Sequence, residues 1–273
     1  MLIATWNVNS IRSRIDHVKK WLIENQPDIL CLQETKVEDK DFPVEVFTNL
    51  GYQFSIKGQK SYNGVAIISR HPLDDVQIGF EDVILNNKEA SHLSEQKRVI
   101  SALINDIRII NVYVPNGSSL DSEKFNYKKK WISYLKIYLD KYISSQEPIC
   151  LLGDFNIAPE DKDIHSPDNF KDKIMASSIE RELLNNVIGG KLEDVFRIFE
   201  PGDNHWTWWD YRHSAWEKNN GWRIDHIYIT EELLSITRSC WIDKKIRSKH
   251  KPSDHVPVVL DIAWPFVEEE NEF

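Results

Sequence analysis

The sequence predicts an α/β fold of mixed β-sheets with helices packed against them. Short apolar runs typical of strands alternate along the chain with longer amphipathic segments typical of helices. Two pairs of these runs are separated by short turns, which predicts antiparallel hairpins and therefore mixed sheets. Two such sheets packed face to face, with helices outside, would suit a chain of 273 residues, although periodicity alone does not establish that architecture.

The first half of the chain divides into strands, a helix and two hairpins. Residues 2–7 and 28–33 are expected to be strands, and the second is apolar enough to be central and buried. An amphipathic helix is expected between them, over about residues 11–25. The predicted hairpins pair residues 52–57 with 64–69, and residues 99–104 with 107–114 through a turn at Asn105-Asp106.

The second half contains two predicted helices and three predicted strands. Residues 121–143 present a broad apolar face and are expected to form a long helix. A second helix is expected over residues 177–190, ending at its two glycines because glycine is favoured at helix C-termini. The predicted strands are residues 148–153, 223–230 and 255–262.

The composition is typical of a globular domain. Hydrophobic residues make up 41% of the chain and charged residues 28%, which allows a sizeable core with a solvated surface. No apolar run approaches the ~18 residues needed to span a bilayer, and the first residues lack the pattern of a signal peptide. We therefore expect a cytoplasmic protein without membrane attachment. No linker or repeat divides the chain, which predicts one domain over residues 1–265 and an acidic tail over 266–273.

The net charge of −9 argues against a protein that simply coats nucleic acid, because such proteins neutralise phosphates with lysine and arginine. An enzyme that neutralises one phosphate with a divalent cation needs less basicity. Local basic stretches remain at residues 12–14, 128–130 and 244–251. Among the three cysteines, Cys31 and Cys150 lie in apolar runs and are expected to be buried free thiols.

Polar residues repeatedly stand where the predicted strands end or begin. Each has an ordinary structural explanation, such as a turn residue, a helix cap or an ion-pair partner. Together they fit a hard divalent cation, which prefers oxygen ligands. Carboxylates are available from Glu34, Asp154 and Asp254, and neutral oxygen donors from Asn7 and Asn156.

One histidine, His255, directly follows a candidate ligand, and Asp225 is available from another segment to orient it. No serine or cysteine nucleophile motif competes. The set therefore predicts metal-assisted hydrolysis with water as the nucleophile. We expect Mg²⁺ as the cofactor, and Mn²⁺ would also suit oxygen ligands.

Six motifs in order resemble the signature blocks of the exonuclease III family of AP endonucleases, within the endonuclease/exonuclease/phosphatase superfamily: WNVNSIR, LQETK, NVYVPNG, GDFNIAP, WRIDHI and PSDHVPV. They span nearly the whole chain. The resemblance implies a four-layered α/β sandwich of two mixed β-sheets flanked by helices, as in deoxyribonuclease I, with the site at one edge. It also implies a DNA-repair nuclease that cleaves 5′ to abasic sites in duplex DNA and has 3′-5′ exonuclease and 3′-phosphatase or phosphodiesterase activity.

The resemblance also implies roles for individual residues. Glu34 would be the principal magnesium ligand, and the assisting ligands would be Asn7, Asp154, Asn156 and Asp254.

The same resemblance assigns catalytic roles. Tyr113 would contact the phosphate, Asp154 would handle protons, and Asn156 would stabilise the transition state. His255, held by Asp225, would face the scissile phosphate. Whether Asp154 or His255 deprotonates the water stays open at this point.

Contacts to nucleic acid are expected at Asn9 and Asn116. Some relatives have aspartate where Asn9 stands, so Asn9 is expected to contact phosphate and not the metal. The segment HWTWWDYR, residues 205–212, resembles an aromatic block of the bacterial branch. We expect Trp206 and Trp222, ahead of the neighbouring tryptophans, to line a pocket for a flipped-out abasic sugar, the alternative being core packing.

Two other functions compete with this hypothesis. An inositol-phosphate or sphingomyelin hydrolase of the same superfamily would share the metal and histidine positions, but the GWRID, PNG and aromatic segments favour a DNA enzyme. A catalytically silent DNA-binding relative should have lost ligands, whereas every expected position here holds a competent residue. We therefore expect a monomer that acts on double-stranded DNA with abasic sites or 3′ ends, associated with the nucleoid while it acts.

Overall fold

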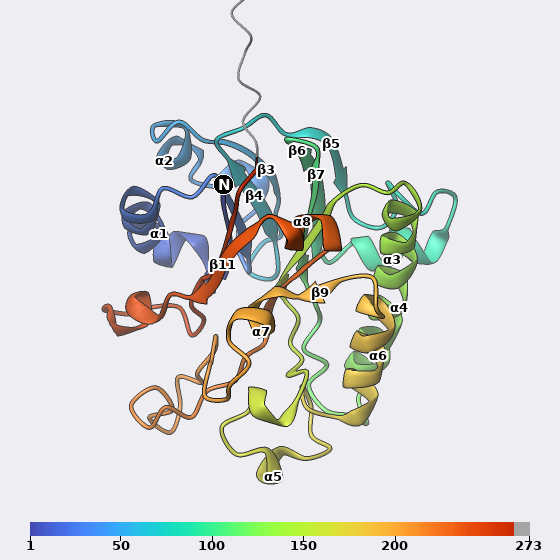
Figure 1. The fold of residues 1–273 in the computed structure, drawn as a ribbon, viewed down its shortest axis with the longest axis vertical. Helices are drawn as coiled ribbons and strands as arrows, with labels where there is room; N and C mark the ends of the chain where they lie inside the picture. Colours follow the sequence, from blue (N-terminus) through green and yellow to red (C-terminus); the bar gives the residue numbers. More distant parts are fainter. Residues whose placement is uncertain (265–273) are drawn as a thin grey trace, which may run out of the picture.

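The computed structural model describes residues 1–264, which form two six-stranded sheets packed face to face (Figure 1). The expected acidic tail lies outside the described residues. In the first sheet the strand order is β11-β12-β1-β2-β4-β3, and in the second it is β5-β6-β7-β8-β10-β9. The first sheet contains β1 (Leu2–Asn7), β2 (Ile29–Gln33), β3 (Gln53–Lys57), β4 (Val65–Ser69), β11 (Thr237–Ile242) and β12 (Val258–Ile262). The second contains β5 (Asp74–Ile78), β6 (Val99–Ile104), β7 (Ile107–Tyr113), β8 (Ile149–Asp154), β9 (Glu193–Asp194) and β10 (Asp225–Ile229).

Helices cover the outer face of each sheet and complete four layers. Figure 1 shows α1 and α2 on one side and α3, α4 and α6 on the other. The helices are α1 (Ile11–Asn25), α2 (Val44–Thr48), α3 (Lys88–Ser94), α4 (Glu123–Ser144), α5 (Pro167–Phe170), α6 (Ser178–Ile188), α7 (Val195–Phe199) and α8 (Glu231–Ser235). Short 3₁₀ turns are η1 (Asp39–Asp41), η2 (Asp161–Asp163) and η3 (Lys244–Ser248). The predicted sandwich of two mixed sheets flanked by helices is confirmed.

Three apolar layers hold the sandwich together. The central layer lies between the two sheets and includes Ile29, Ile67, Ile109 and Leu152, all fully buried. The outer layers join α1 and α2 to the first sheet and α3, α4 and α6 to the second. Burial of apolar surface is the main stabilising term in folding, so these layers fix how the two sheets face each other. The cysteines at positions 31, 150 and 240 are buried free thiols, which confirms the prediction for the first two.

The long elements agree with the sequence predictions to within a few residues. The turn at Asn105-Asp106 has both residues at positive φ, as a two-residue hairpin loop requires. The elements β9, α2, α3, α5, α7 and α8 were not predicted, because they are too short to show a period. Strands β5 and β11 were not predicted either, because their sequences, DDVQI and TRSCWI, contain no long apolar run. No helix within residues 1–264 has the length and apolar character to cross a membrane.

Both sheets contain one parallel pair, and this decides where the functional residues meet. Strand β1 runs parallel to β2, with Asn7 opposite Gln33, and β7 runs parallel to β8, with Tyr113 opposite Asp154. Antiparallel β10 places its first residue, Asp225, opposite Asp154. The carboxyl ends of four central strands and the start of β10 therefore lie at one edge of the sandwich.

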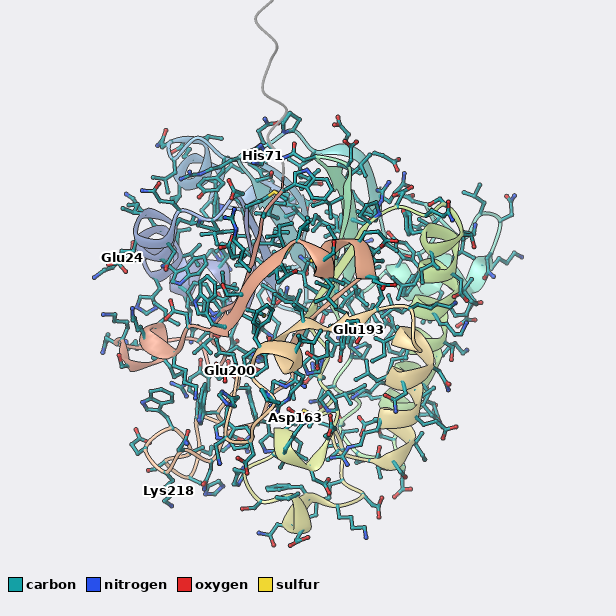
Figure 2. The ribbon with its side chains drawn as sticks, in the orientation of Figure 1. Glu24, His71, Asp163, Glu193, Glu200 and Lys218 are labelled. Atoms are coloured by element: carbon teal, nitrogen blue, oxygen red, sulfur yellow. The ribbon has the colours of Figure 1, made fainter. Side chains whose placement is uncertain are left out.

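A buried charge network fixes the segment that leads into β10. The Asp163 carboxylate accepts from Arg223 Nε at 2.6 Å and from the Arg197 guanidinium, and Arg223 also bonds Asp194 Oδ2 at 2.8 Å. Figure 2 shows Asp163 between α7 and α5. Burial alone would raise the pKa of Asp163, but the two arginines outweigh it and lower the pKa to about 2. The network therefore positions the chain two residues before Asp225.

We expect Asp163→Asn to lower the free energy of unfolding by about 3 kcal/mol, because it leaves Arg223 and Arg197 buried without their shared countercharge. Urea unfolding at neutral pH measures this loss. The matched control, Glu24→Gln, breaks an exposed ion pair with Lys20 on α1 and should change stability little.

The depressed pKa of Asp163 predicts that the free energy of unfolding depends on pH in the acidic range. Folding depresses the pKa of Asp163 from 3.8 to about 2. The contribution of its charge to stability is therefore fully present above pH 3.8 and is lost as the pH falls toward 2. The stability gap between wild type and Asp163→Asn should therefore narrow across that window. A gap that stays constant would contradict the pairing.

Candidate active site

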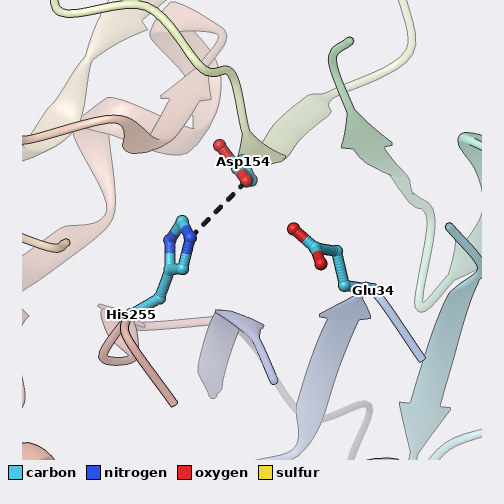
Figure 3. Close-up of side chains that lie close together, drawn as sticks. All are labelled: Glu34, Asp154 and His255. Carbon is cyan, nitrogen blue, oxygen red and sulfur yellow. Dashed lines mark ion pairs between the residues drawn. The ribbon is translucent and has the colours of Figure 1, made fainter. Parts of the chain in front are cut away.

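Glu34, Asp154 and His255 converge at the edge of the sandwich, although they come from three different segments (Figure 3). Glu34 follows β2, Asp154 ends β8, and His255 precedes β12. Each offers one ligand atom, and these three atoms lie within 4.8 Å of one another. Asp154 and His255 are buried, and Glu34 is partly buried.

Asn7 joins the two carboxylates across the sheets. Its Nδ2 donates to Glu34 Oε1 at 2.9 Å and to Asp154 Oδ2 at 2.8 Å. Its Oδ1 accepts from the backbone N–H of Asn9 at 3.0 Å, which fixes the orientation of the amide. The amide nitrogen therefore faces the carboxylates. The role of Asn7 as an oxygen ligand stays a prediction.

Two further groups contact Glu34. Lys36 Nζ lies 2.7 Å from Glu34 Oε2, and the Tyr113 hydroxyl donates to Glu34 Oε1 at 2.9 Å. Burial would raise the pKa of Glu34, but Lys36 and the Asn7 amide outweigh it and lower the pKa. Burial and the Glu34 charge raise the pKa of Tyr113 well above its usual value, so its hydroxyl is a neutral donor. Arg98 lies over the Tyr113 ring, 4.4 Å from its centroid.

Asp154 is 1% exposed and is held by a tight local turn. The backbone N–H of Asn156 donates to its Oδ1 at 2.9 Å, and Asn156 Nδ2 lies 3.3 Å from its Oδ2. Gly153 precedes it with φ +146°, and a Cβ there would collide with the Val112 carbonyl. Burial raises the pKa of Asp154, the His255 charge and the Asn7 amide oppose this, and the Asp225 and Glu34 charges add to it; the net result is a pKa of about 7.

His255 lies between two carboxylates. Its Nδ1 is 2.8 Å from Asp225 Oδ2 and 3.1 Å from Oδ1, and its Nε2 is 3.8 Å from Asp154 Oδ2. Burial opposes the charged ring, but Asp225 and then Asp154 outweigh it and raise the pKa of His255 to about 10. The structure thus brings Asp225 and His255 together, as the sequence analysis expected.

His226 follows Asp225 on β10, but its side chain points away from the site, because successive strand residues point to opposite faces of the sheet. His226 stacks on Phe155 and is bonded to the Tyr228 hydroxyl at 3.0 Å. Burial and the Arg223 charge lower the pKa of His226 to about 3.

Asp254 stands beside the three converging residues but not among them. Its Oδ1 accepts from Asn9 Nδ2 at 2.9 Å, and its Oδ2 accepts from Trp208 Nε1 at 3.0 Å. Asn9 Oδ1 in turn accepts from Lys36 Nζ at 2.5 Å. Asn9 thus links Lys36 to Asp254, which neighbours the three converging residues, and the role of Asp254 as a metal ligand stays a prediction.

Sequence reasoning gave no role to Lys36, although it belongs to the LQETK motif. The only sequence signal was its position two residues after Glu34. Both residues have positive φ, and this conformation turns the two side chains toward each other.

Asn116 and Asn156 are paired. Asn116 Nδ2 donates to Asn156 Oδ1 at 3.0 Å, and Asn116 itself is exposed. The oxygen of Asn156 therefore faces Asn116 and not the carboxylates. Asn156 contacts Asp154 through its nitrogen atoms, and its role as an oxygen ligand stays a prediction.

An aromatic hollow of about 360 Å³ lies next to this site. Trp208 and Trp222 line it, and Phe170 packs edge-on against Trp222 at 4.9 Å between ring centroids. The Trp208 ring is 6.4 Å from the His255 ring. The expectation for Trp222 agrees with this position. Trp206 was expected to line a pocket, but it is 1% exposed within the apolar layer that includes α1, and its indole N–H donates to the Asn219 carbonyl.

The converging residues suit a divalent cation. Glu34 and Asp154 offer carboxylate oxygens, and Lys36 supplies a positive charge beside Glu34. His255 Nε2 lies in the same group, but the raised pKa of His255 keeps a proton on this nitrogen, so it offers no lone pair to a cation. Two close carboxylates repel each other unless a cation or donors lie nearby. Among the described residues these are the three that group as metal candidates, and Glu34 and Asp154 are the hard oxygen ligands that Mg²⁺ prefers.

Comparison with known proteins gives a consistent result. Residues 4–255 match the Endonuclease/Exonuclease/phosphatase family. Exodeoxyribonuclease III of Haemophilus influenzae is 34% identical over 270 residues, which cover 94% of this chain and 98% of that protein. A 3′ phosphatase from Neisseria, solved with a product DNA hairpin, is 38% identical with a TM-score of 0.91. An AP endonuclease from Archaeoglobus fulgidus is 40% identical with a TM-score of 0.89. Each structure aligns over 97% of this chain and 100% of its own.

We expect Glu34→Gln to weaken divalent-cation binding, because it removes one of the two negative charges that face the site. Electron paramagnetic resonance titration of chelator-treated protein with Mn²⁺ measures binding without reference to activity. The matched control is Glu38→Gln, which alters an exposed carboxylate on the same segment. An unchanged Mn²⁺ affinity in Glu34→Gln would count against Glu34 as a ligand.

Proposed function

Because the chain belongs to the endonuclease/exonuclease/phosphatase family, we propose that it is a DNA-repair nuclease. It hydrolyses phosphodiester bonds 5′ to abasic sites and removes nucleotides and phosphates from 3′ ends of duplex DNA. The observation that carries the proposal is the convergence of Glu34, Asp154 and the His255–Asp225 pair at one edge of the sandwich. The named activities of the relatives support DNA as the substrate.

We assign the metal to Glu34 and Asp154, with Mg²⁺ as the physiological ion. When bound, the cation supplies positive charge to the scissile phosphate and the leaving 3′ oxygen. Asn7 keeps the two carboxylates together from the opposite side. Lys36 balances the Glu34 charge and keeps it ionised.

The contacts of His255 favour a proton on both ring nitrogens, because each nitrogen faces a carboxylate. We therefore assign His255 to donate from Nε2 to a non-bridging phosphate oxygen. This assignment leaves Asp154 as the group that accepts a proton from the attacking water. Its carboxylate accepts from Asn7 and Asn156, which orient it.

The neutral Tyr113 hydroxyl lies beside Glu34 and can donate to the phosphate. Arg98 over its ring adds positive charge on the same side. Asn9 and Asn116 stand on the rim of the site and are assigned to phosphate contacts of the DNA strand.

The aromatic hollow is assigned to the abasic sugar. A nucleotide lacking its base presents an apolar sugar edge, and extrusion from the helix costs a few kcal/mol that a shaped apolar wall must offset. Trp208 and Trp222 provide that wall close to His255. The relatives, an exodeoxyribonuclease III, a 3′ phosphatase solved with a DNA product and an AP endonuclease, favour a DNA substrate over an inositol-phosphate or sphingomyelin substrate.

A silent DNA-binding protein is the weaker alternative, because both carboxylates and the His255–Asp225 pair are in place. Magnesium-dependent nicking of a duplex with one abasic site tests the proposal, and absence of nicking with Mg²⁺ or Mn²⁺ contradicts it. Action as a monomer in the cytoplasm, at the nucleoid, stays a prediction.

We predict that His255→Ala lowers kcat by about two to four orders of magnitude, the usual effect of removing a positioned proton donor. Asp225→Asn should lower it in part, and the double variant should lose less than the sum, because the two residues act as one unit. Single-turnover nicking of an abasic duplex measures all three. His226→Ala, on the opposite face of β10, is the control. Additive losses in log rate would show that the two residues act independently.

We predict that Trp222→Ala reduces abasic-site incision about tenfold more than removal of a 3′ phosphate, because a terminal phosphate needs no extrusion. The ratio of the two kcat/KM values is the readout. Trp216→Ala is the matched control, since Trp216 packs against Trp209 outside the hollow. Equal losses on both substrates would assign Trp222 to packing alone.

A further inference from the structure

Lys128 is a charged residue inside the protein, directly behind the active site. It was expected in a basic surface stretch, but its side chain is fully buried on α4, as is that of its partner Glu180 on α6. Burying a charge costs free energy unless it is paired and hydrogen-bonded. Lys128 satisfies that requirement with three acceptors, and their identity indicates what the lysine does.

Two of the acceptors are backbone carbonyls of active-site loops. Lys128 Nζ donates to the Asn156 carbonyl at 2.8 Å and to the Asn116 carbonyl at 3.1 Å. The third acceptor is Glu180 Oε1. One ammonium group therefore ties together the turn that follows β8 and the loop that follows β7.

Both carbonyls belong to residues whose side chains act at the site. The side chains of Asn116 and Asn156 bond each other at 3.0 Å, and Asn156 holds Asp154 through its backbone N–H. Asn156 has φ +49°, a left-handed conformation that asparagine tolerates better than most residues. The Lys128 contact to its carbonyl helps to hold the backbone there.

Glu180 extends the connection to the wall of the aromatic hollow. Its Oε1 also accepts from the Met175 N–H at 3.1 Å, and its Oε2 accepts from the Ser177 hydroxyl at 2.6 Å. Met175 lines the hollow and lies 3.2 Å from Asn116 Nδ2. Glu180 is also the N3 residue of the capping box that starts α6. The ion pair thus reaches three segments around the site.

We propose that Lys128, paired with Glu180, is a positioning residue for the hydrolytic reaction. Its ammonium group sets the backbone of Asn156 and Asn116 and, through them, the direction of the Asp154 carboxylate. An apolar residue could fill the same volume, but it could not bond the two carbonyls. The inference rests on the proposed function, because it concerns the efficiency of that site.

The test compares Lys128→Met/Glu180→Gln, which removes the donor without leaving an unpaired buried charge, with Lys136→Met/Asp140→Asn. The control pair lies on the same helix but is exposed. Circular dichroism first selects the folded variants. On an abasic duplex, or whichever DNA substrate the wild type cleaves, we expect kcat of the Lys128 variant to fall about 10²-fold with KM unchanged. The control should keep wild-type values.

Lys128→Gln keeps a neutral donor and should have an intermediate kcat, and it is the decisive variant if the double variant does not fold. The side-chain amide NMR signals of Asn116 and Asn156 provide a readout independent of activity and should shift in both Lys128 variants. A folded Lys128 variant with wild-type kcat overturns the proposal, as does a loss confined to KM. If the wild-type protein cleaves no DNA, the proposed function fails, and unshifted amide signals are then the result that overturns the positioning.

Discussion

The site depends on two carboxylates from different sheets whose oxygen atoms lie within 4.8 Å of each other at the edge of the sandwich. Glu34 follows β2 of the first sheet and Asp154 ends β8 of the second, and the Asn7 amide donates to both. That contact is possible only because the apolar layer between the sheets sets their separation. Each sheet also has its parallel pair at the centre, so the carboxyl ends that carry these residues reach the same edge.

Charge balance is the second constraint. Glu34, Asp154 and Asp225 bring three carboxyl groups into a region of low water access, where His255 and Lys36 are the nearest cations. Lys36 outweighs burial at Glu34 and lowers its pKa, whereas burial and the neighbouring carboxylates outweigh His255 at Asp154 and raise its pKa to about 7. In the proposed function both carboxylates hold the cation, and the raised pKa of Asp154 also suits it to exchange a proton.

Sequence reasoning identified the converging residues because each lies next to a strand with a clear pattern. The predictions from sequence were less accurate for the direction in which a side chain points. Trp206 and Trp208 are two residues apart, yet Trp206 lies in the core and Trp208 lines the hollow. Lys128 looked like a surface cation, although its spacing from Phe125 and Trp131 places it on the buried face of α4.

The sequence by itself determined the long elements, the mixed character of the sheets and the residue types available for metal-assisted hydrolysis. These follow from local periodicity and from the chemistry of individual side chains. Only the tertiary structure decided which atoms face each other. The hydrogen bond from the Asn9 N–H turns the Asn7 amide nitrogen toward the carboxylates, and Asn9 and Trp208 donate to the Asp254 carboxylate beside them. Such orientations depend on hydrogen bonds between residues far apart in the chain, which no local pattern encodes.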